Sequence, residues 1–72
     1  MSQCTECQRL RGEYLKATFA HARITNKKQI AALRRDHAIV AELDIMEQTA
    51  LEERRRAGAA YSAHTKTHSA AA

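Results

Sequence analysis

The stretch IAALRRDHAIVAEL, residues 30–43, decides the fold of this 72-residue chain, because the helical pattern changes phase within it. Before it, seam residues recur at alternating steps of three and four, which indicates a helix packed lengthwise on a partner. Extending that register would place positions 35, 42, 49 and 56 on the seam, whereas the stripe that follows uses 36, 43, 50 and 57. The first stripe consists of Cys7, Leu10, Tyr14, Ala17, His21, Ile24, Lys28 and Ala31.

This one-residue slip predicts a turn near 34–37, although neither glycine nor proline marks it. Asp36 is suited to cap the second helix there, because its carboxylate accepts free backbone N–H groups. We therefore expect one helical domain over 1–72, with a helix at about 5–34, a helix at about 37–66 and a frayed tail at 69–72. The second stripe is expected to consist of Ile39, Leu43, Met46, Ala50, Ala57, Ala60 or Tyr61, His64 and His68.

The composition favours helix throughout the chain. There is no proline, only two glycines, and abundant alanine, leucine, arginine and glutamate. The predicted fold class is all-α, an antiparallel two-helix hairpin. One uninterrupted helix of about 60 residues in an intermolecular coiled coil is the alternative, which the phase slip disfavours.

Two pairs of potential metal ligands lie near the two ends of the chain. Cys4 and Cys7 have C-x-x-C spacing, and His64 and His68 have H-x-x-x-H spacing. A hairpin that turns near residue 36 brings both pairs to the same end. Two thiolates and two imidazoles complete a tetrahedral shell, which predicts a structural zinc site. Two alternatives remain: the cysteines act alone, in redox chemistry, a disulfide or a cysteine-only metal site, or there is no site.

The predicted seam is too thin to stabilise a monomer. A chain of this length buries only about 60% of its unfolded surface, and much of the seam is alanine. The first helix also carries apolar residues on the side away from the seam, and such a helix needs a second partner. We therefore expect a homodimer that forms a four-helix bundle. The residues on this outer side are Leu15, Phe19, Ala22, Ile30 and Leu33.

The net charge of +4 admits two interpretations. In the first, the arginines lie on a solvated helix face, because Glu52 and Glu53 precede the basic run at 54–56 and can pair with Arg56 at helical spacing. Alternatively they form a nucleic-acid-binding surface, although no aromatic platform accompanies them. No apolar run reaches the roughly 20 residues needed to span a membrane, and no secretory signal opens the sequence, so we expect a cytoplasmic protein. The arginines of the alternative are Arg34, Arg35, Arg54, Arg55 and Arg56.

The whole pattern resembles a set of small, uncharacterised bacterial helical proteins with an N-terminal CxxC and a C-terminal HxxxH. The resemblance covers nearly the whole chain and implies the hairpin and the ligand set, but no established activity. The matching residues are Cys4, Cys7, Leu10, Glu13, Tyr14, Ala17, Thr18, His21, Asp36, His64 and His68.

The function predicted from the sequence is a non-enzymatic helical scaffold or adaptor, stapled by structural zinc at its chain ends. A basic nucleic-acid-binding module is the alternative. A thiol redox sensor at the CxxC motif is a weaker one, because the strand that precedes such motifs in thioredoxin-like folds has no counterpart in this sequence.

Overall fold

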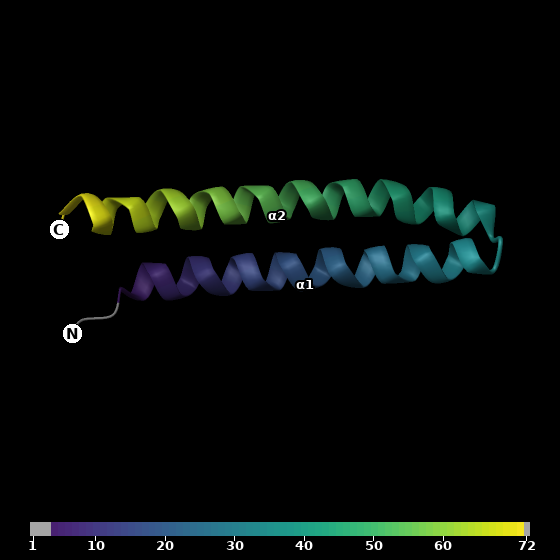
Figure 1. Ribbon diagram of the computed structural model, residues 1–72, viewed down its shortest axis with the longest axis horizontal. Helices are drawn as coiled ribbons and strands as arrows, with labels where there is room; N and C mark the ends of the chain where they lie inside the picture. Colours follow the sequence, from purple (N-terminus) through teal and green to yellow (C-terminus); the bar gives the residue numbers. More distant parts are fainter. Residues whose placement is uncertain (1–3, 72) are drawn as a thin grey trace.

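The computed structural model is a hairpin of two long antiparallel helices, and it describes residues 4–71, with side chains through His68. Helix α1 spans Thr5–Leu33 and helix α2 spans His37–Ala71. The two lie side by side along a rod with principal extents of 53 × 17 × 13 Å, and the start of α1 and the end of α2 lie at the same end of it (Figure 1). The all-α prediction is confirmed, and the single uninterrupted helix is wrong. Over the described residues, neither helix has a stretch long and apolar enough to cross a membrane.

The turn occupies 34–36 and is built without glycine. Arg35 adopts a left-handed conformation (φ 59°), and its N–H bonds to the carbonyl of Ala32 at 3.0 Å. The Asp36 N–H bonds to the carbonyl of Ala31 at 3.0 Å. These two bonds form the Schellman motif that commonly ends helices, with arginine at the position where glycine is usual. The carboxylate of Asp36 then accepts the N–H of Ile39 at 3.3 Å, which confirms its predicted role as helix cap.

The seam predicted for the first helix is confirmed. Leu10 and Ala31 are buried, and the residues between them at the same spacing are half-buried. By contrast, the residues expected on the outer side of α1 are exposed, with Phe19 64% and Leu33 85% exposed.

The seam predicted for the second helix is partly wrong. Leu43, Ala50 and His64 are buried or half-buried as expected, but Ile39 and Met46 are 44% and 51% exposed. Ala60 is also exposed whereas Tyr61 is half-buried, so of the two candidates Tyr61 occupies this seam position. The half-buried residues at the remaining seam positions are Val40, Glu47 and Arg54.

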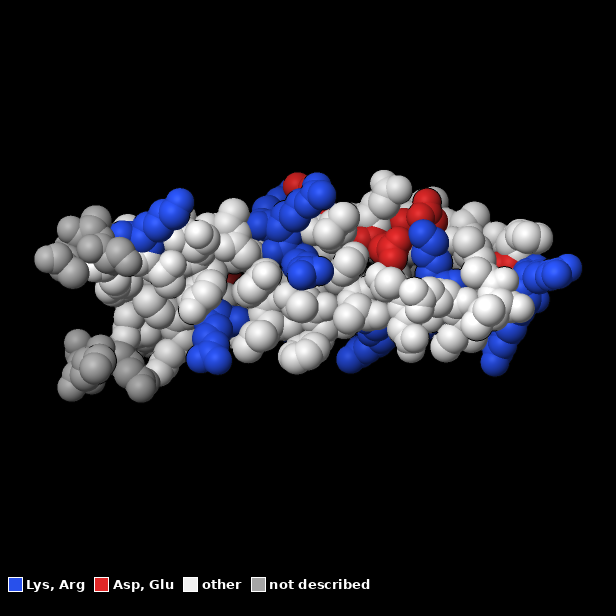
Figure 2. All heavy atoms as spheres, in the orientation of Figure 1, with Lys and Arg blue, Asp and Glu red and all other residues white. Residues whose placement is uncertain are grey.

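Polar partners across the hairpin explain why charged residues occupy this seam. The ammonium group of Lys28 donates to Asp44 at 2.7 Å and to Glu47 at 3.0 Å, and the Thr25 hydroxyl donates to Glu47 at 2.6 Å. We call these four residues the polar cluster. Acidic side chains gather on the α2 half of the face in Figure 2, with basic side chains beside them. Apolar periodicity alone could not identify seam positions that are filled by such pairs.

Helix α2 continues to Ala71, beyond the end expected near residue 66. The hydroxyls of Thr65 and Thr67 bond to the carbonyls of Ser62 and His64, at 2.9 and 2.6 Å. These threonines therefore satisfy helical carbonyls instead of ending the helix. The expected frayed tail at 69–72 lies within the helix up to Ala71, and residue 72 lies outside the described residues.

The hydrophobic core is small. Among the described residues only Leu10, Ala31 and Ala50 are buried apolar residues, and two of the three are alanines. Burial of apolar surface is the main stabilising contribution in folding, and alanine contributes little of it. The two helices therefore need stabilisation beyond their shared seam.

Candidate metal centre

Four predicted ligands meet at the open end of the hairpin. Cys4 is the N-cap of α1 and Cys7 lies in its first turn, whereas His64 and His68 lie one turn apart near the end of α2. The two helices differ by only a few residues in length, so folding at 34–36 places both pairs at the same level. The contact between chain ends is therefore set by the turn, which lies at the other end of the rod (Figure 1).

The distances between the four side chains suit a single metal ion. One sulfur or ring nitrogen from each of Cys4, Cys7, His64 and His68 lies within 4.8 Å of the others. The Nε2 atom of His64 lies 3.2 Å from the Sγ of Cys4 and 3.2 Å from the Nε2 of His68. A tetrahedral zinc site with bonds of about 2.0–2.3 Å has edges of about 3.3–3.8 Å. The longest separation between the four atoms would have to shorten by about 1 Å to match the edges of such a site.

The two cysteines have different environments. The Sγ of Cys4 contacts His64 and accepts the backbone N–H of Cys7 at 3.4 Å. These two hydrogen bonds, the one with His64 first, lower the pKa of Cys4 to about 6. Burial, and the neighbouring Cys4 after it, raise the pKa of Cys7 above its ordinary value. One thiolate is therefore available at neutral pH, and the second thiol would lose its proton on binding a metal.

The site is partly shielded from solvent, and a neighbouring carboxylate is already paired with an arginine. Cys4, Cys7 and His64 are half-buried, and His68 is exposed. The carboxylate nearest in sequence to the cysteines, Glu6, is held by Arg9 at 2.6 and 2.9 Å, which keeps its pKa below the usual range. The four side chains together can supply the four ligands of a tetrahedral metal shell.

A tyrosine pair lies next to the metal centre and was not anticipated from the sequence. The rings of Tyr14 and Tyr61 stack with their centroids 6.5 Å apart and an interplanar angle of 19°. Beside them, a Cβ on Gly58 would lie 3.0 Å from Cε1 of Tyr14. The missing side chain at Gly58 therefore allows the Tyr14 ring to approach the backbone of α2. The signal in the sequence was a glycine inside a helix, where it is otherwise unfavourable.

The structure does not bring the five arginines of the nucleic-acid alternative together. Arg34 and Arg35 lie at the turn, whereas Arg54 lies 17 positions after the start of α2, roughly 25 Å along the helix. Arg54 is half-buried in the seam, where its Nη1 lies 3.5 Å from Nδ1 of His21. On the face in Figure 2, basic side chains are spread along the rod in separate groups. The remaining histidine, His37, is exposed at the start of α2.

Comparisons with protein-family models, curated proteins and solved structures found no significant match to this chain. The candidate site is therefore interpreted from its own geometry.

Proposed function

We propose that this protein is a non-enzymatic helical scaffold whose chain ends are stapled by one structural zinc ion. The observation that carries the proposal is the meeting of Cys4, Cys7, His64 and His68 within 4.8 Å at the open end of the hairpin. Two thiolates and two imidazoles are ligands that zinc binds readily, whereas magnesium and calcium prefer oxygen ligands.

The small core supports a structural role for the metal. With three buried apolar residues, the hairpin gains little from packing, and a metal that binds only the folded chain adds its binding free energy to folding. The turn joins the helices at one end of the rod, and zinc would join them at the other. We also propose that the hairpin self-associates, because large apolar side chains remain exposed on it.

The metal content of the native protein tests this function. We expect native mass spectrometry of protein purified without chelator to show one zinc per chain. Cys4→Ser, Cys7→Ser, His64→Ala and His68→Ala should each reduce the zinc content, whereas His37→Ala, at the turn end, serves as the matched control and should keep it. Protein that binds no zinc, while Cys4 and Cys7 form a reversible disulfide, would contradict the staple and favour the redox alternative.

A further inference from the structure

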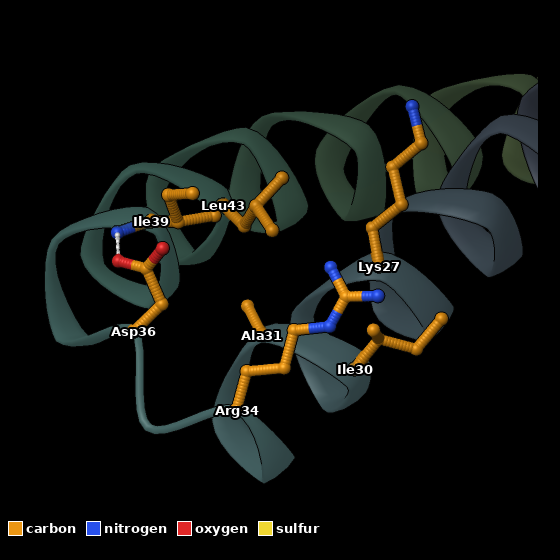
Figure 3. A pocket seen from close by; sticks show the side chains of 7 residues that line it. All are labelled: Lys27, Ile30, Ala31, Arg34, Asp36, Ile39 and Leu43. Atoms are coloured by element: carbon orange, nitrogen blue, oxygen red, sulfur yellow. Dashed lines mark hydrogen bonds between the residues drawn. The ribbon is translucent and has the colours of Figure 1, made fainter.

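Two hollows of about 300 Å³ each lie between the helices, one beside the turn and the next near the middle of the rod. We call them together the turn-side groove; its floor consists of Ile24, Ala31, Leu43 and Ala50. Figure 3 shows the hollow nearer the turn, with apolar side chains of both helices facing each other across it.

Both rims of the groove carry apolar side chains that are left exposed, among the charged ones. Ile30 of α1 is 42% exposed, and Ile39 and Met46 of α2 are 44% and 51% exposed. These α2 residues are the ones that the sequence pattern assigned to the intramolecular seam. Their side chains are not buried within one chain, and such exposed apolar residues are typical of a contact with another molecule.

The chain exposes more surface than a compact monomer of its mass would. A compact monomer of 8.1 kDa exposes about 4,500 Å², whereas this chain exposes 5773 Å². The excess, roughly 1,300 Å², is more than the roughly 800 Å² that each partner buries in an interface of standard size. The chain as a whole therefore has enough uncovered surface to supply one side of a dimer interface of standard size.

The charges along the two rims favour a second copy of this chain as the occupant. On the α1 rim, Lys27 and Arg34 line the groove. On the α2 rim, Glu53 lines it and Glu42 lies between Ile39 and Met46 at helical spacing. One rim is therefore basic and the other acidic, so the surface is complementary to itself under a two-fold rotation.

We infer that two hairpins bury their turn-side grooves against each other, with the two-fold axis parallel to the helices. This inference rests on the self-association in the proposed function and specifies its surface. In this arrangement α1 of each chain lies over α2 of the other, and basic rims meet acidic rims. A two-fold axis across the helices would instead stack α1 on α1, so that basic rims would face each other. The parallel axis also places both metal centres at the same end of a four-helix bundle.

The internal contacts of the hairpin fix the level at which the chains meet. Lys28 pairs with Asp44 and Glu47 across the seam, so Lys27 lies at about the level of Met46. A two-fold axis parallel to the helices preserves that level. Lys27 therefore faces α2 of the second chain about one helical turn from Glu42 of the partner subunit.

Sedimentation equilibrium of the full chain tests the surface. We expect a wild-type mass twice that of the 8.1 kDa chain, with Met46→Asp reduced to monomer. Leu15→Asp is the matched control, because Leu15 is also exposed, at 42%, but lines neither hollow of the groove. It should remain dimeric. A monomeric wild type, or dissociation by Leu15→Asp and not by Met46→Asp, would overturn the inference. Zinc content measured on the same samples separates failure of the staple from failure of the interface.

Charge reversal tests the orientation without relying on an apolar-to-charged change. At low salt we expect Lys27→Glu and Glu42→Lys each to raise the dimer dissociation constant about tenfold, and the double variant to restore it. If α1 instead lay over α1, Lys27→Glu would relieve repulsion and lower the dissociation constant. That result would overturn the proposed axis.

Discussion

The Sγ atom of Cys4 lies 3.2 Å from Nε2 of His64, although 60 positions separate the two residues. Every helical residue between them contributes to this distance, because an error of one residue in the turn would shift one ligand pair against the other by about 1.5 Å. The geometry of the metal centre therefore depends on the register of the whole hairpin, and a bound metal would in turn stabilise that hairpin.

Removing zinc should destabilise the entire protein. At zinc concentrations well above its dissociation constant, linkage adds several kcal/mol to the folded state, so chelation should lower Tm by about 15 °C or more. Cys4→Ser and His64→Ala should melt near the chelated wild type even with zinc present. His37→Ala should melt near the zinc-bound wild type. Calorimetry at one fixed protein concentration measures these values, and equal wild-type Tm with and without chelator would contradict the staple.

Acid should weaken the polar cluster through Glu47. The hydrogen bond from Thr25, and after it Lys28, keeps the pKa of Glu47 below its ordinary value of 4.5. The unfolded chain therefore binds a proton more readily, so the stabilising contribution of Glu47 is full above pH 4.5 and is lost as the pH falls through the folded pKa.

The Glu47→Gln variant isolates this contribution. In metal-free protein, the difference in Tm between wild type and Glu47→Gln should be positive at pH 7 and shrink below about pH 4.5. Glu52→Gln, an exposed residue five positions later on α2, is the control and should show no such trend. A Glu47→Gln difference that stays constant down to pH 3 would show that the cluster does not couple folding to this proton.

The sequence was sufficient to predict the hairpin and the meeting of Cys4, Cys7, His64 and His68, and the reasons are physical. A phase slip between Leu33 and His37 is visible because helical periodicity is strict, and ligand pairs can be recognised by residue type and spacing. Seam positions on α2 were harder to identify. Glu47 and Arg54 lie on the seam because Lys28 and His21 face them from α1. The periodicity of one helix contains no information about its partners on the other helix.

The glycines of the two helices should respond oppositely to alanine. A Cβ at Gly12 would meet nothing within 4 Å, so Gly12→Ala should stabilise the hairpin by about 0.5–1 kcal/mol and raise Tm by several degrees. At Gly58 the same Cβ would lie 3.0 Å from the ring of Tyr14. Displacement of that ring should offset the gain in helix propensity.

Thermal denaturation of Gly12→Ala, Gly58→Ala and a Tyr14→Ala/Gly58→Ala double variant measures this contact. We expect Gly58→Ala alone to gain nothing or to lose stability. In the Tyr14→Ala background, the same change should stabilise as at Gly12. Equal gains at Gly12 and Gly58 in the wild-type background would show that Tyr14 does not pack on the backbone of α2.

Arg35 in the turn has a strained backbone conformation, because its φ of 59° lies in the left-handed region that is unfavourable for residues with a Cβ. Replacing it with glycine removes that strain, because glycine adopts the left-handed region freely, so Arg35→Gly should stabilise the folded chain by about 1 kcal/mol. Arg34 has φ −83° and is the matched control, since glycine there only increases the freedom of the unfolded chain. We therefore expect Tm to rise for Arg35→Gly and to fall slightly for Arg34→Gly. The opposite order would contradict a left-handed conformation at Arg35 and the turn built on it.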